Sequence, residues 1–221
     1  MNRTAPSPRR EKAAPRPSGP GRPKDLGKRA AILEAAKRLF PHDGFAGVSM
    51  DQIAAEAGVS KLTVYSHFGD KEALFAAVVR AKCEEMLPDD LFQQETKGPL
   101  REQLQAIASG YFALVSSDEA ISTHRMMIAP GNADDPLRKL FWEAGPQRTQ
   151  AAFASFLQAR VDAGEMDIPQ VDRASEQFFC LLKGRMHGLM MCGLCEKPAR
   201  AEVKAHIDAT VDMFLRAYAA R

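Results

Sequence analysis

Apolar residues recur at intervals of three and four positions along most of this chain. The clearest example lies in residues 199–220, whose apolar positions are Val203, Ile207, Val211, Phe214 and Tyr218. This spacing gathers side chains on one face of an α-helix, whereas a half-buried strand would alternate apolar and polar residues. From Asp25 onward we find no convincing alternation of that kind. The pattern therefore predicts an all-α protein.

Capping residues, glycines and prolines divide residues 25–87 into four predicted helices. Pro41 lacks the N–H that a helix interior needs, so we expect Pro41 and Gly44 to end the first helix. Side-chain oxygens that accept from first-turn amides mark the starts of the other three. These caps are Ser49 (with Gln52 completing a capping box), Ser60 and Asp70.

The second and third predicted helices are short and are separated by the turn Gly58-Val59. Two such helices form a helix-turn-helix, whose second helix enters the major groove of DNA with its amino end first. The stretch SKLTVYSHF at this helix is rich in hydrogen-bonding side chains, which suit phosphates and base edges. We predict that double-stranded DNA is contacted by Ser49, Ser60, Lys61, Leu62, Thr63, Tyr65, His67 and Lys71.

Positive charge is concentrated at the amino end of the chain. Residues 1–29 contain nine Lys or Arg and two acidic residues, a net charge of +7, whereas the remainder has a net charge of −5. Residues 1–24 hold six prolines and no periodic apolar positions, so they are predicted to form a disordered arm. Arg22 and Lys24 would contact phosphates. A solubilising tail is the alternative interpretation.

The segment 29–79 contains the motifs ILEAAKRLF and DGFAGVSMDQIAAEAGVSKLTVYSHFGDKEALFAAVV, with a Tyr65-x-His67-Phe68 box inside the second. With these motifs it resembles the DNA-binding domain of TetR/AcrR-type bacterial transcriptional regulators. It departs from the usual pattern at Leu62, where many members have glycine. The resemblance implies a DNA-binding head followed by a helical ligand-binding and dimerisation body. It further implies a homodimer that represses transcription at a palindromic operator and is released by a small apolar effector.

We therefore expect an arm (1–24), a helix-turn-helix DNA-binding domain (25–87) and a helical ligand-binding and dimerisation domain (88–221). Helix-breaking residues such as Gly145-Pro146 separate the predicted helices of the ligand-binding and dimerisation domain. Its predicted helices are 100–116, 120–129, 136–144, 146–163, 171–193 and 199–220. Gly184 and Gly188, four residues apart, would let two helices approach closely, either across the subunit interface or within one subunit.

Aromatic and other apolar residues of the predicted body could line an effector pocket, and a few polar groups would orient the ligand. Taken singly, each apolar candidate is better explained as a core residue, but as a set some should line a pocket if the resemblance holds. The candidates are Tyr111, His124, Met127, Trp142, Phe153 and Phe179.

The motif Cys192-Gly-Leu-Cys195 suggests an alternative function. The chain would then be a thiol- or metal-responsive regulator with the same DNA-binding head. Neighbouring His187 and several methionines would add soft ligands for copper(I) or zinc. A metal site needs three or four ligands in suitable geometry, and cysteine and methionine are also ordinary core residues. Packing is therefore the favoured interpretation, and we predict no metal.

No enzyme motif is present: we find no nucleophile elbow, no phosphate-binding glycine loop and no HExxH. We therefore expect no enzymatic activity and no cofactor. The first residues, MNRTAPSPRR, lead into no apolar run, and no stretch approaches the ~18–20 apolar residues of a membrane span. These features predict a cytoplasmic protein without a membrane partner.

Overall fold

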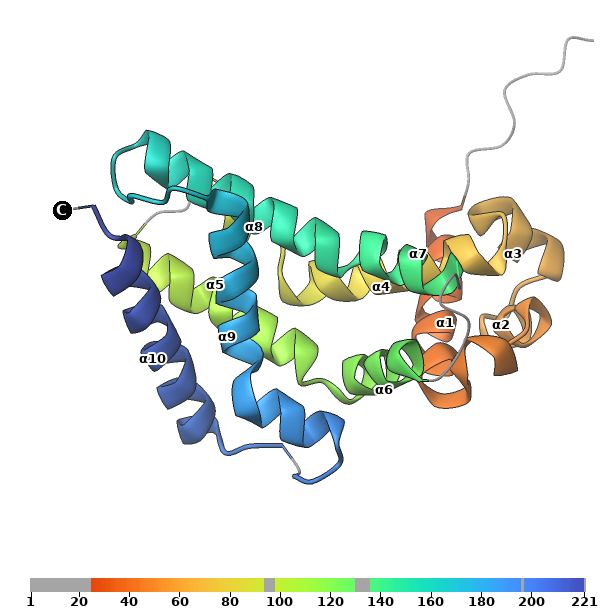
Figure 1. The fold of residues 1–221 in the computed structure, drawn as a ribbon. Helices are drawn as coiled ribbons and strands as arrows, with labels where there is room; N and C mark the ends of the chain where they lie inside the picture. The colour runs from red at the N-terminus through yellow and green to blue at the C-terminus, as the bar shows by residue number, and fades with distance from the viewer. Residues whose placement is uncertain (1–24, 94–97, 130–135, 196, 221) are drawn as a thin grey trace, which may run out of the picture.

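The computed structural model describes residues 25–93, 98–129, 136–195 and 197–220, which form an all-α protein (Figure 1). The predicted fold class is confirmed, and among these residues the β-type pairing is limited to one isolated bridge, Met166 to Ala219. The predicted arm lies outside the described residues. The elements are α1 (Leu26–Gly47), α2 (Met50–Glu56), α3 (Lys61–Phe68), α4 (Lys71–Met86), the 3-10 helix η1 (Asp89–Phe92), α5 (Leu100–Val115), α6 (Asp118–Ile128), α7 (Pro136–Ala144), α8 (Pro146–Asp162), α9 (Val171–Met191) and α10 (Arg200–Tyr218).

The predicted caps fix the starts of α2, α3 and α4. Ser49 Oγ accepts from the Gln52 amide at 3.2 Å, and Gln52 Oε1 accepts from the Ser49 amide at 2.7 Å, which completes the capping box. Ser60 Oγ accepts from the Thr63 amide at 3.2 Å, and Asp70 caps α4 in the same way. These bonds satisfy amides that have no partner inside the helix. The six predicted helices after residue 99 agree with α5 to α10 within two residues at each end.

The first helix differs from its prediction, because α1 continues through Pro41 and changes direction at Gly44. Gly44 has φ 72°, a left-handed conformation that glycine adopts without strain. Proline removes one hydrogen bond from a helix, but α1 is packed against α4 and α6. Phe40 and Phe45, on either side of Pro41, contact Phe75 of α4, and Ser122 of α6 donates to the Pro41 carbonyl. That packing stabilises the helical turn at Pro41, so the prediction that Pro41 ends the helix is wrong.

Two hydrophobic cores organise the molecule, and α4 contributes to both. One core joins α1 to α4 and also includes Met127 of α6 and Ala144 of α7. The other gathers α5, α8, α9 and α10 around aromatic residues such as Phe153 and Phe178. Helix α6 packs against α1 and α7 packs against α4, and Figure 1 shows both toward the end of the molecule that carries α2 and α3. The core of the predicted DNA-binding head therefore extends beyond residue 87.

A second kink lies in α9 at Gly184, where φ is 48°. A Cβ atom at this position would lie 3.1 Å from Cε1 of His206 in α10, whereas a Cβ at Gly188 would meet nothing within 4 Å. The close approach at Gly184 is therefore to a helix of the same subunit. Among the described helices, none combines the length and the apolar character needed to cross a membrane.

Candidate DNA-binding surface and effector cavity

Helix α3 buries one face in the head and exposes the other. Val64 and Phe68 are buried, whereas Leu62 is 78% exposed and Tyr65 is 41% exposed. Ser60 and Lys61 are also exposed, and Thr63 and His67 are partly buried. The predicted contact residues of α3 therefore lie on or beside a single free face. Such a face is what a recognition helix needs in order to enter a groove.

Several polar groups near α3 already have partners. Ser49 and Ser60 use their hydroxyls as helix caps, and Thr63 Oγ1 lies 2.8 Å from Ser60 Oγ. Lys61 Nζ donates to Asp51 Oδ2 at 2.9 Å, and this bond raises the pKa of Lys61. A phosphate approaching Lys61 would therefore compete with a carboxylate for its ammonium group.

The side chain of Lys71 forms hydrogen bonds with the main chain and does not extend freely into solvent. Its Nζ donates to the carbonyls of Phe45 and Val48 at 2.9 and 3.0 Å, and it lies 4.2 Å from the centroid of the Phe45 ring. Two of its three donors thus bind α4 to the carboxyl end of α1 and to the connection that follows it. The sequence reasoning missed this role because the partners are main-chain groups distant in sequence.

Two further predictions concern His67 and the arm. Nδ1 of His67 is buried, and no described residue forms a hydrogen bond with it. Arg22 and Lys24 lie outside the described residues. Arg29, one of the basic residues concentrated at the amino end, is exposed and lies 4.9 Å from the centroid of the Phe68 ring in α3. This position puts a guanidinium beside the recognition helix.

A cavity of about 700 Å³ lies where the two cores meet. Its walls come from α1 and α4 on one side and from α5 to α9 on the other. Four of the six predicted ligand residues line it: Tyr111, His124, Trp142 and Phe179. The other two, Met127 and Phe153, do not line this cavity: Met127 packs in the core with α1 to α4, and Phe153 is fully buried in the other core. Sequence periodicity marks buried positions but does not separate a core residue from a cavity wall.

The inner walls of the cavity are mostly apolar. Phe75 and Val79 of α4 face it, and the rings of Tyr111 and Phe179 pack with their centroids 4.2 Å apart. Burial raises the pKa of the Tyr111 phenol well above its usual range. Burial also raises the pKa of the Cys83 thiol to about 11. Both groups are therefore neutral at pH 7, and this part of the cavity carries no charge.

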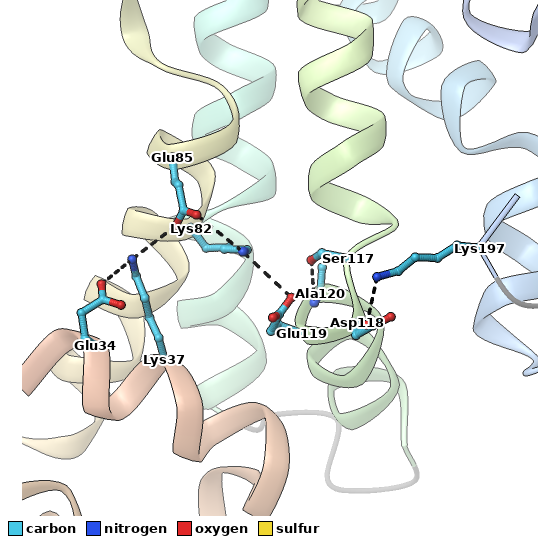
Figure 2. Close-up of polar contacts among 9 residues, drawn as sticks. All are labelled: Glu34, Lys37, Lys82, Glu85, Ser117, Asp118, Glu119, Ala120 and Lys197. Carbon is cyan, nitrogen blue, oxygen red and sulfur yellow. Dashed lines mark hydrogen bonds and ion pairs between the residues drawn. The ribbon is translucent and has the colours of Figure 1, made fainter. Parts of the chain in front are cut away.

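One side of the cavity carries a chain of ion pairs that joins α1, α4 and α6 (Figure 2). Lys37 lies 2.8 Å from Glu34 and 3.3 Å from Glu85. Lys82 lies 3.9 Å from both Glu85 and Glu119. The sequence reasoning missed these pairs because Lys37 and Glu85 are 48 residues apart and leave no local pattern.

His124, which lines the cavity, lies beside His187 of α9, with the two ring centroids 6.0 Å apart. His124 Nδ1 lies 3.1 Å from the carbonyl of Ala120, so Nδ1 carries the proton. Burial lowers the pKa of His124, and the charge of Lys183 lowers it further. Burial, His124 and Lys183 together lower the pKa of His187 to about 4. Both rings are therefore neutral at pH 7.

Helix α6 connects the cavity to the end of α9. The guanidinium of Arg125 donates to the carbonyls of Met190 and Met191 at 2.7 and 3.0 Å. These carbonyls lie in the last turn of α9, where a cation is favoured by the helix dipole. Beyond them, Cys192 and Cys195 are exposed free cysteines. Within the described part of the chain, no three or more His, Cys, Asp or Glu residues are grouped so that they could hold a metal.

Comparisons with known proteins agree with this arrangement. Residues 32–78 match the model of the bacterial regulatory proteins of the tetR family. Residues 102–220 match the model of the AefR-like transcriptional repressor C-terminal domain. The helix-turn-helix transcriptional activator FasR of Mycolicibacterium smegmatis is 32% identical over 108 residues, which are 47% of this chain and 49% of FasR. The chain thus spans about half the length of that relative.

Solved structures extend the similarity to nearly the whole fold. A putative TetR-family regulator from Mesorhizobium loti is 29% identical with a TM-score of 0.74, and the match covers 88% of this chain and 98% of that one. The flavonoid-responsive regulator FrrA is 31% identical with a TM-score of 0.68, covering 89% of this chain and all of FrrA. Since the two family matches fall on the two halves of the described fold, the chain belongs to the TetR family of bacterial transcriptional regulators.

Proposed function

We propose that the chain is a homodimeric repressor that leaves a near-palindromic operator when a small, largely apolar molecule occupies the cavity. The observation that carries this proposal is the position of the cavity, which shares walls with α1 and α4 of the head and with α5 to α9. A ligand there contacts both the DNA-binding part and the remainder of the molecule. The free energy of ligand binding can therefore favour one orientation of the DNA-binding part relative to the remainder of the molecule over another orientation.

The DNA contacts in this proposal come from the free face of α3 and its surroundings. Residues 25–87 form the DNA-binding domain, residues 88–221 form the ligand-binding and dimerisation domain, and residues 1–24 supply a basic arm. Base edges are read from the amino end of α3, and phosphates are held by the flanking residues. The contact set is Ser49, Ser60, Lys61, Leu62, Thr63, Tyr65, His67 and Lys71, with Arg22 and Lys24 from the arm.

The dimer in this proposal is formed by α9 and α10 of each subunit. The outward face of α10 carries a line of exposed small or apolar residues four apart: Ala201, Ala205, Ala209, Met213 and Ala217. Leu181 of α9 is a further exposed apolar residue. Small residues let two helices approach closely, and the remaining apolar area would be removed from water by pairing. These features support a four-helix interface.

Repression and an apolar effector have separate support. The match over residues 102–220 is to a repressor domain, which favours repression over activation. FrrA, at 31% identity over its whole length, is described as flavonoid-responsive, and this favours an aromatic ligand for the cavity of this chain. In a dimer, two α3 helices must reach successive major grooves about 34–36 Å apart. An effector that changes this spacing would lower the affinity for the operator.

The test is a selection of tight binders from random duplex DNA, with the purified full-length chain at near-physiological salt. The expected result is an enriched site with two-fold symmetry, bound by two subunits in sedimentation measurements. A Thr63→Ala variant should bind this site more weakly and with relaxed sequence preference. Binding that is only general and strongly salt-sensitive would contradict the proposal, because it would show that charge alone holds the DNA.

A further inference from the structure

We infer that the effector is an organic anion, an apolar molecule of aromatic character whose single carboxylate is held by Lys183. This inference rests on the proposed function, because it specifies the chemical class of the ligand for the same cavity. Lys183 lies on α9, is partly buried and lines the cavity.

The charged side chains of the cavity are the first evidence. Apart from the histidines, most belong to ion pairs: Lys37 with Glu34 and Glu85, Lys82 with Glu85 and Glu119, and Arg38 with Glu56. Asp118 on the cavity wall pairs with Lys197 at 3.0 Å (Figure 2). Lys183 differs from all of these, because within the described residues it has neither an ion pair nor a hydrogen bond. It is the cation that a ligand can neutralise without breaking an existing pair.

The surroundings of Lys183 make a counterion favourable. Lys183 precedes His187 by four residues on α9, and its charge contributes to the lowered pKa of both His187 and His124, whose imidazoles are neutral at pH 7. Neutral rings do not compensate a positive charge, and a partly desolvated cation without a partner is costly. A carboxylate at this position gains a charge-assisted hydrogen bond in surroundings less polar than water. A ligand amine would instead meet repulsion from Lys183.

Aromatic residues of the cavity wall near Lys183 offer a surface for the apolar part of the ligand. Phe179 is one helical turn before Lys183 on α9, so the two side chains project from the same face. The Tyr111 ring packs against Phe179, and its hydroxyl has no hydrogen-bond partner among the described residues. Trp142 also lines the cavity. An aromatic ring on this wall would leave its carboxylate directed toward Lys183.

The test compares three probes that share one apolar body: 4-phenylbutyrate, 4-phenyl-1-butanol and 4-phenylbutylamine. Binding to the full-length chain is measured by calorimetry and by the fluorescence of Trp142, which is the single tryptophan. The carboxylate should bind at least about tenfold more tightly than the alcohol, in keeping with the strength of a charge-assisted hydrogen bond. The amine should bind most weakly.

Three variants assign the preference to one residue. Lys183→Gln should abolish the advantage of the carboxylate over the alcohol, and Lys183→Arg should retain it because the charge remains. Lys139→Gln is the matched control, since it removes the same charge from a lysine on α7 that is exposed and does not line the cavity. It should leave the ranking of the probes unchanged. Circular dichroism establishes that each variant is folded.

The outcomes separate this inference from the proposed function. If the alcohol or amine binds as tightly as the carboxylate, if no probe binds, or if Lys183→Gln keeps the preference, then the anionic ligand class is wrong. None of those results affects the operator selected from random DNA. If the carboxylate binds through Lys183 but leaves the operator complex intact, the ligand class is correct and the proposed release by a ligand fails.

Discussion

The hydroxyl of Ser122 in α6 donates a 2.6 Å hydrogen bond to the carbonyl of Pro41 in α1. In a straight helix that carbonyl would accept from the amide of Phe45. The kink at Gly44 separates the two groups, and the Phe45 amide instead donates to Sδ of Met126 at 3.2 Å. Side chains of α6 therefore bond both the carbonyl of Pro41 and the amide of Phe45, which would bond to each other if α1 were straight. Since α6 also lines the cavity, this contact joins a ligand-facing helix to the head.

Ser122→Ala tests that contact. It leaves the Pro41 carbonyl without its donor, so we expect the free energy of unfolding to fall by about 1 kcal/mol in urea titrations. Ligand binding should also have less effect on operator affinity, because α6 is held less firmly to α1. Ser155→Ala is the control, since Ser155 is exposed and its hydroxyl bonds only to Ala151 in its own helix. An equal loss of stability in both variants would remove any special role for Ser122.

Leu62→Ala tests whether an exposed leucine reads DNA. Leu62 is 78% exposed near the amino end of α3, so its removal should change the free energy of unfolding by less than about 0.5 kcal/mol. If its methyl groups contact a thymine methyl, operator affinity should fall by about 1 kcal/mol while the salt slope of binding stays constant. Leu194→Ala provides the control, because that leucine is also largely exposed, at 73%, but follows α9. Unchanged operator affinity in Leu62→Ala would exclude the contact.

Lys71→Met separates a structural role from a phosphate contact. Loss of its bonds to the Phe45 and Val48 carbonyls should lower the free energy of unfolding by about 1–2 kcal/mol. If Lys71 also neutralises a phosphate, the slope of log affinity against log salt should decrease in magnitude by about 1. Lys139→Met corrects for the change in net charge. A lower stability with an unchanged slope would assign Lys71 to structure alone.

Acidification should destabilise the protein through its paired histidines. The folded pKa of His187 is about 4, below the ordinary value of ~6.5, so the unfolded chain binds more protons between these values. The free energy of unfolding is therefore fully maintained above pH 6.5 and falls as the pH drops through this window. At pH 5 we expect a loss of about 2 kcal/mol from His187. Chemical unfolding at pH 7.5 and 5 should show a smaller difference in His187→Gln, with the remainder assigned to His124 and other groups.

Local signals in the sequence were sufficient for most of the fold. Ser49, Ser60 and Asp70 mark helix starts because a cap bonds within three residues of itself, and apolar spacing is likewise a local property. Pro41 shows the limit of this reasoning. Whether a helix tolerates a proline depends on packing against α4 and α6, which lie far away in sequence.

The cavity was less predictable for the same reason. Tyr111 and Phe179 were recognised as aromatic candidates, but Phe153 has the same local pattern and lies in a core. Lys183 was not singled out at all, because its proposed role depends on the lack of a carboxylate partner among the described residues, which only the assembled helices reveal. Pairs such as Lys37 with Glu85 appear only once the helices are assembled.

Gly184 and Gly188 can be separated by alanine substitutions. Gly184→Ala places a Cβ at positive φ and 3.1 Å from His206 Cε1, so we expect a loss of about 1–2 kcal/mol in the free energy of unfolding. Gly188 lies in a helical segment where a Cβ meets nothing within the subunit, so Gly188→Ala should maintain or raise the stability of that subunit. If a second subunit approaches closely at Gly188, the same substitution should weaken dimerisation in sedimentation equilibrium. An unchanged dimer dissociation constant would place the interface away from Gly188.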